Sequence, residues 1–168
     1  MGLPDIRVLG FALLLRWEWQ KRAADAPPWT KLPSKPEKLV SAMFSCSVVV
    51  ELGDGTSARF WTDSWLTAGP IATFAPHLFR AVGRRFLLVS VKDALSGHHW
   101  VRHISRAHTA PVLYEYVDLW EKLEDVQLQP LVSDRFIWRW TPDGTYSASS
   151  AYRSFFLGMS SLLGAKEL

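Results

Sequence analysis

Four aspartates have a side chain suited to metal-assisted chemistry: Asp54, Asp63, Asp134 and Asp143. A polymerase or a nuclease needs two or more carboxylates that converge on a divalent metal ion. Asp54 and Asp143, however, each precede a glycine in a turn signal, where aspartate ordinarily bonds to the local backbone. Asp63 has the position of a helix N-cap. Because no two aspartates are adjacent in the sequence, we expect no metal-dependent polymerase site and no enzyme activity.

Histidines are the second set of residues that could bind a metal, since four of them lie between positions 98 and 108. His99 and His103 would share one face of a helix at a spacing of four residues. The glutamate of a zinc-protease motif is missing between them, and the sequence has a single cysteine, Cys46. That cysteine excludes an internal disulfide, and its apolar surroundings favour a small core residue. We therefore expect no metal and no cofactor.

Motifs for other enzyme classes are missing as well. The sequence has no Gly-x-Ser-x-Gly, and Gly53-Asp54-Gly55 lies between two expected strands rather than before a helix, so we expect no phosphate loop and no small-molecule substrate. The apolar run from Val8 to Leu15 is far shorter than the roughly 20 residues that span a bilayer, so no membrane partner is expected. The helical pattern continues past this run, which favours the nucleus or cytoplasm over secretion.

A basic segment carries the main signal for a binding function. The net charge of the 168-residue chain is +3, but it is unevenly distributed. Between positions 80 and 108 one acidic residue accompanies six basic residues: Arg80, Arg84, Arg85, Lys92, Arg102 and Arg106. With the interleaved rings of Phe86, His98, His99 and Trp100, this segment could follow a phosphate backbone while stacking bases. The alternatives are a solvated surface, or pairing with the acidic residues between Glu115 and Asp143.

Helical patterns occupy much of the chain. We expect helices over 5–22, 37–45 and 109–126, and a last helix over 150–157 that stops at Gly158. Short helical turns are predicted over 61–65, 76–82 and 90–95, the last with Ser90 as N-cap. The prolines between positions 26 and 36 predict a linker.

Two Asp-Gly turns predict two β-hairpins. The first turn, at Asp54-Gly55, would join strands 47–52 and 58–61, and the second, at Asp143-Gly144, would join strands 135–140 and 145–147. The expected fold class is therefore α+β, with short helices, two β-hairpins and partly irregular structure. Five segments are predicted: an N-terminal helix (1–25), a Pro-rich linker and short helix (26–46), a hairpin with an aromatic and basic irregular region (47–108), an amphipathic helix with the second hairpin (109–158), and a tail (159–168).

Several motifs resemble one family in a shared order. They are Gly53-Asp54-Gly55 followed by Phe60-Trp61, Asp63 and Trp65; the opening run 12–19; the run 91–95; and Asp134 to Trp138 followed by Gly144, Tyr146 and Tyr152. This order resembles plant non-LTR (LINE-type) retroelement reverse transcriptases, in the part between the polymerase core and the reverse transcriptase zinc-binding domain. The resemblance covers about residues 2–156.

The resemblance implies a connector rather than a catalyst. The family's catalytic carboxylates would lie before Met1 and its Cys/His zinc cluster after Leu168, so neither set transfers to a position of this sequence. The implied structural residues are Gly53, Asp54, Gly55, Phe60, Trp61, Asp63, Trp65, Asp134, Trp138, Gly144, Tyr146 and Tyr152.

Three interpretations of function stay open. The first is a non-catalytic polyprotein fragment that binds RNA or DNA weakly through the basic segment at 80–108. The second is a structural module whose tryptophan faces dock on a neighbouring polymerase domain. The third is a degenerate remnant without a selected function.

Overall fold

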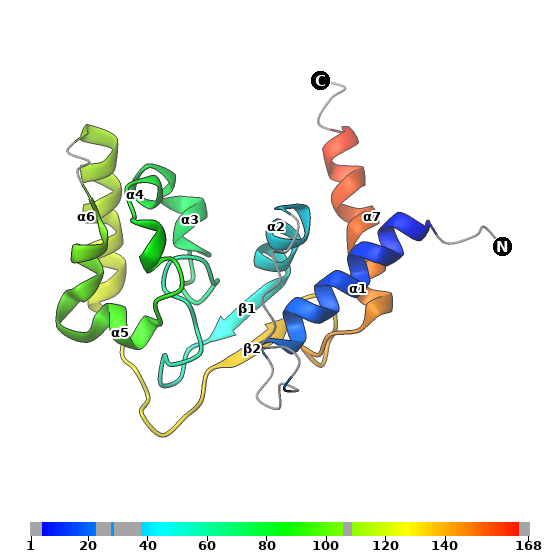
Figure 1. Cartoon of the computed structure of the whole chain (residues 1–168), viewed down its shortest axis with the longest axis horizontal. Helices are drawn as coiled ribbons and strands as arrows, with labels where there is room; N and C mark the ends of the chain where they lie inside the picture. The colour runs from blue at the N-terminus through cyan, green and yellow to red at the C-terminus, as the bar shows by residue number, and fades with distance from the viewer. Residues whose placement is uncertain (1–4, 23–27, 29–37, 106–108, 165–168) are drawn as a thin grey trace. The chain divides into compact units, whose positions relative to one another are not determined.

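The structure is a computed structural model that describes residues 5–22, 28, 38–105 and 109–164, with side chains of the last helix described as far as Phe156. The chain divides into two compact units (Figure 1). One unit comprises Met1–Ser47 and Ile137–Leu168, and the other comprises Val48–Phe136. Across the described residues the fold is α+β with short helices, a two-stranded sheet and irregular stretches, which confirms the predicted fold class.

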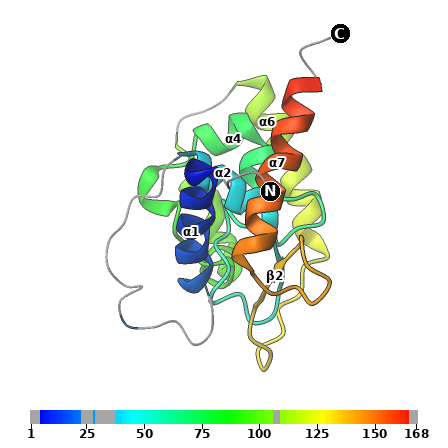
Figure 2. The ribbon, with the colours of Figure 1, turned by 90° about the vertical axis from the view of Figure 1, so that its right-hand side faces the viewer.

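Three helices build the first unit: α1 (Ile6–Gln20), α2 (Lys38–Ser47) and α7 (Ala148–Gly164). Helix α1 begins where the sequence predicts, because the Asp5 carboxylate accepts the backbone N–H groups of Arg7 and Val8. Val8, Ala12 and Leu15 form its buried face, and α1 packs against both α2 and α7. Figure 2 shows α1 and α7 from the side, turned by 90° from Figure 1.

Two tyrosines connect the ends of the first unit. The Tyr152 hydroxyl accepts the backbone N–H of Asp5 at 3.0 Å, and the Tyr146 hydroxyl donates to the carbonyl oxygen of Ala12. The Tyr146 ring also packs edge-on against Trp138, with 4.9 Å between centroids. The two hydrogen bonds join α1 and its cap to α7 and to the segment that precedes α7, across more than 130 positions of sequence.

Short helices and one longer helix build the second unit. They are α3 (Ile71–Phe74), α4 (Pro76–Arg80), η2 (Arg84–Phe86), α5 (Val91–Leu95), η3 (Ser96–His103) and α6 (Ala110–Glu124). They surround an aromatic core in which Phe60, Trp61 and Trp100 are almost completely buried. Ser90 caps α5 as predicted, since its hydroxyl accepts the backbone N–H of Asp93.

The strands pair differently from the two predicted hairpins. Strand β1 (Val48–Glu51) pairs antiparallel with β2 (Arg135–Trp138), which is distant in sequence. Residues 58–60, the expected partner of β1, instead lie beside residues 89–91, with a bridge between Arg59 and Ser90. At the second turn the Trp138 N–H donates to the Gly144 carbonyl oxygen, yet 145–147 form no strand. The turns are therefore present, but a distant segment supplies the strand partner.

Three local predictions need correction. Helix α7 begins at Ala148 and continues to Gly164 rather than stopping at Gly158, because one glycine inside a helix costs only about 1 kcal/mol. The short helical turn predicted over 61–65 is only a turn at 61–62 and a bend at 63, without helix. Cys46 is exposed, since α2 buries Val40, Phe44 and Ser47 on its other side.

The linker predicted over 26–36 lies outside the described residues apart from Pro28. In the part of the chain that the structure describes, no helix has the length and apolar character needed to cross a membrane.

Candidate nucleic-acid interface

Two short segments of the second unit lie side by side and bring basic residues together. Val82 and Ile104 form an antiparallel bridge, the Gly83 N–H donates to the His103 carbonyl oxygen at 3.0 Å, and the Ser105 N–H donates to the Ala81 carbonyl oxygen at 2.9 Å. This register pairs 82 with 104 and 83 with 103. Arg84 directly follows the paired residues in η2, and Arg102 directly precedes them in η3.

The basic side chains around this pairing are exposed. Arg80 ends α4, Arg84 and Arg85 lie in η2, and Arg102 lies in η3. None of these four arginines forms an ion pair with a carboxylate of the described residues. The guanidinium of Arg85 lies over the Phe86 ring, 4.6 Å from its centroid. The four side chains form what we call the arginine surface: Arg80, Arg84, Arg85 and Arg102.

Two of the six predicted basic residues fall outside this surface. Lys92 is exposed on α5, and its backbone N–H donates to the Gly55 carbonyl oxygen. Its charge contributes to the lowered pKa of Asp54, which depends first on hydrogen bonds from the Thr56 backbone and side chain. Arg106 lies outside the described residues.

Two of the four aromatic residues predicted to stack bases are occupied by contacts within the fold, whereas His98 and His99 are exposed. Trp100 is only 1% exposed, because it packs against Phe60, Tyr116 and Trp120. The ring of Phe86 already stacks on His103 at 4.3 Å and lies under Arg85. The prediction that Trp100 stacks on bases is therefore wrong, and phosphate contact is the chemistry that this surface offers.

His103 is a buried core residue rather than a solvated one. Its Nδ1 accepts the indole N–H of Trp61 at 3.2 Å. Burial, with a contribution from the charge of His99, lowers the pKa of His103 below its ordinary 6.5. The neutral ring with its proton on Nε2 is the form that this hydrogen bond requires.

Two acidic residues of α6, Glu115 and Asp118, have other partners than the arginine surface. Glu115 accepts the backbone N–H of Leu78 at 2.7 Å, and its other oxygen lies 2.6 Å from Nδ1 of His77. It thereby caps the start of α4, where no local side chain does so. Asp118 pairs with Lys122 one turn along α6. These contacts leave the exposed guanidinium groups available to an anion.

All four candidate aspartates accept backbone N–H groups. Asp54 and Asp143 bind the second residue after them, Thr56 and Thr145, as the turn signals predict. Asp63 accepts the N–H of Arg59, four residues earlier, so its predicted role as a helix N-cap is wrong. Among the described residues, no three histidine, cysteine or acidic side chains gather as a metal site would require.

Asp134 organises the first family motif. One of its oxygens accepts the N–H groups of Gly53 and Gly55 at 2.8 and 2.9 Å, and the other accepts those of Ser57 and Ala58 at 2.8 and 2.9 Å. The motif residues Phe60, Trp61 and Trp65 are buried beside this loop, and the Trp65 indole N–H donates to the Phe60 carbonyl oxygen.

The remaining motif residues lie in the first unit. Trp138 is fully buried and donates its indole N–H to the Ser150 hydroxyl at 2.9 Å. Gly144 has a φ of 69°, the left-handed conformation that favours glycine in a turn. Every motif residue that the sequence singled out therefore has a structural contact within its own unit.

Comparisons with known proteins do not assign a family to the chain: no family model, curated protein or solved structure matches it.

Proposed function

We propose that this chain is a non-catalytic segment of a retroelement reverse transcriptase polyprotein that binds RNA or DNA through the arginine surface, in the nucleus or cytoplasm. The observation that carries the proposal is the pairing of residues 81–83 with 103–105, because exposed arginines flank both paired segments in the sequence. Guanidinium groups bind phosphate with two parallel hydrogen bonds, and each neutralised phosphate releases counterions.

The cost of gathering like charges supports this proposal. Like charges on neighbouring segments repel one another, and an opposite charge nearby relieves this repulsion. The ion pairs of the described residues place no carboxylate on any of the four arginines. A phosphate group would supply the missing negative charge.

The test is fluorescence anisotropy with labelled single-stranded RNA and DNA over a range of salt concentrations. The double variant Arg84→Gln/Arg102→Gln should bind at least about tenfold more weakly at low salt. Its plot of log affinity against log salt should be shallower by about 1.4, because about 0.7 is lost per phosphate contact on single strands.

The matched control is Arg7→Gln/Arg153→Gln, which removes the same charge from exposed positions of α1 and α7. It should retain most of the affinity. An equal loss in both double variants would show that only net charge matters, and absence of binding by the parent chain at low salt would refute the proposal.

Exposed apolar residues favour a second function, a module that docks on a neighbouring polymerase domain. Ile6, Leu9 and Leu13 are 83%, 41% and 52% exposed and lie along one side of α1. The tryptophans that were expected to dock are largely unsuitable, since Trp61 and Trp138 are fully buried. Leucine side chains would therefore make the contact.

This second function predicts that a purified polymerase domain of the resembled family binds the chain, and that Leu9→Gln/Leu13→Gln weakens binding without changing nucleic-acid affinity. A degenerate remnant without a selected function predicts neither interaction.

A further inference from the structure

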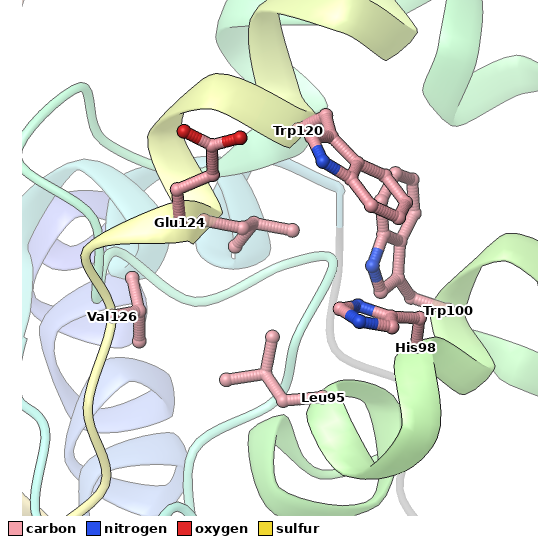
Figure 3. A pocket seen from close by; sticks show the side chains of 7 residues that line it. Leu95, His98, Trp100, Trp120, Glu124 and Val126 are labelled. Atoms are coloured by element: carbon pink, nitrogen blue, oxygen red, sulfur yellow. The ribbon is translucent and has the colours of Figure 1, made fainter.

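A cavity of about 220 Å³ lies in the second unit where α6 ends beside α5 and η3 (Figure 3). Its lining includes an aliphatic group, Leu95, Leu123 and Val126, and an aromatic group, His98, Trp100 and Trp120. An apolar cavity of about 150 Å³ holds benzene, whereas drug-sized ligands occupy about 300–1,000 Å³. The volume therefore suits one compact group rather than a large ligand.

The aromatic rings of the cavity form a connected cluster. The imidazole of His98 stacks on Trp120 with 4.9 Å between centroids, and Trp100 lies 5.6 Å from Trp120 at an interplanar angle of 50°. The chain reaches this arrangement through two successive residues with a φ of 55°, Gly97 and His98. Such a φ is uncommon for a residue other than glycine.

One acidic side chain lines the cavity, and two more lie near it in the sequence. Glu124 is one of the lining residues, and Glu121 and Asp125 are exposed beside it in sequence. None of these three acids has an ion-pair partner among the described residues, whereas Lys122 is occupied by Asp118. The carbonyl groups at the end of α6 add the negative end of a helix dipole.

We infer that this cavity binds an alkylated ammonium group, such as the trimethylammonium of choline or of a trimethylated lysine side chain. Aromatic faces attract such a cation through their quadrupoles, and the methyl groups fit the aliphatic part of the lining. Glu124 in the lining attracts the positive charge and disfavours phosphate, which separates this site from the arginine surface.

The first experiment uses choline and its neutral isostere, in which a quaternary carbon replaces the nitrogen, with the whole chain at low salt. Binding is followed through the indole N–H signals of Trp100 and Trp120 in NMR spectra. Choline should bind in the millimolar range and about tenfold more tightly than the isostere, since a desolvated cation–π contact supplies a difference of this order. Equal binding of the two compounds, or no shift of either indole signal, would overturn the proposal.

Variants distinguish choline binding in the cavity from general electrostatic attraction to exposed acidic residues. Glu124→Gln, on an exposed residue, should weaken choline binding about threefold and leave the isostere unaffected. Trp120→Leu should weaken choline at least about tenfold. Glu51→Gln is the matched control, because it removes an exposed acid outside the cavity. An equal loss in the Glu124 and Glu51 variants would refute the site.

A second arm identifies the source of the ammonium group. Two peptides of identical sequence, one with lysine and one with trimethyllysine, are titrated in the same way. Tighter binding of the methylated peptide than of choline would assign the site to a modified protein partner, and equal affinities would assign it to the free cation. A preference for unmodified lysine would contradict the inference, because the aromatic lining would then have no role.

Discussion

The Asp134 carboxylate accepts the backbone N–H of Gly53 at 2.8 Å, across 81 positions of sequence. The same carboxylate also accepts three further N–H groups of the loop, so that each oxygen receives two hydrogen bonds. Backbone donors that would otherwise lack partners are thereby satisfied. One long-range carboxylate therefore fixes the loop that the sequence suggested was a hairpin turn.

Two replacements of Asp134 should destabilise the second unit to different extents. Asp134→Ala removes all four hydrogen bonds and should lower the free energy of unfolding by about 3 kcal/mol or more, since each bond to a charged acceptor contributes about 1.5–3. Asp134→Asn retains one oxygen and should cost less. Urea denaturation measures both, with Asp125→Asn as an exposed control expected within about 0.5 kcal/mol of the parent. A change below that value for Asp134→Ala would contradict the role of the carboxylate.

Gly53 and Gly10 form a matched pair for glycine substitution. A Cβ atom at Gly53 would lie 2.2 Å from the Val132 carbonyl oxygen and 2.7 Å from the Ser133 carbonyl carbon, whereas Gly10 in α1 has nothing within 4 Å. Gly53→Ala should therefore destabilise the chain by about 3 kcal/mol, because backbone must move. Gly10→Ala should stabilise it by up to about 1 kcal/mol through helix propensity. Urea midpoints that shift in the same direction would disprove this account.

The buried His103 should make the second unit sensitive to acid. Because the folded pKa of His103 lies below 6.5, the unfolded chain binds more protons as the pH falls through about 6.5. This contribution to stability is thus complete above about pH 6.5 and lost toward the lower folded pKa. His103→Gln retains an acceptor for the Trp61 indole but does not titrate. Its urea midpoint should change less than the parent's between about pH 8 and pH 5.5, and equal changes would count against the prediction.

Tyr146 should make the first unit sensitive to base. Burial raises the pKa of Tyr146 to about 12, against an opposing effect of the Arg16 charge. The unfolded chain loses the proton near pH 10 and the folded chain only near 12, so this contribution is complete below about pH 10 and is lost as the pH rises to 12. Tyr146→Phe should remove the transition near pH 12 from a tyrosinate absorbance titration. Its persistence in that variant would assign the transition to another group.

Prediction from sequence succeeded where a residue acts on its own neighbours. The cap at Ser90 and the turn aspartates Asp54 and Asp143 bond within three residues of themselves, so the local sequence contains both partners. The strand partner of β1 was not predictable in this way, because β1 pairs with a segment more than 80 residues away.

In the candidate sites, too, the local features were predictable from the sequence and the long-range contacts were not. The sequence identified the arginines, but the pairing of the two segments that carry them depends on the bridge between Val82 and Ile104. It also suggested that Trp100 was available for stacking, whereas the fold buries this ring against Trp120. The cavity beside Trp120 had no sequence signal, since an aromatic residue on the apolar face of a helix usually belongs to a packed core.

The sequence by itself determined the longer helices approximately, the cap at Ser90, the tight turns and the excess of positive charge between positions 80 and 108. These properties arise from side chains that interact over a few residues, and the local sequence specifies such interactions completely. Only the tertiary structure decided that β1 pairs with β2, that Asp134 closes the Gly53–Ala58 loop, and which tryptophans are buried. Many distant segments offer similar apolar surfaces and backbone donors, and the choice among them depends on the packing of the whole unit.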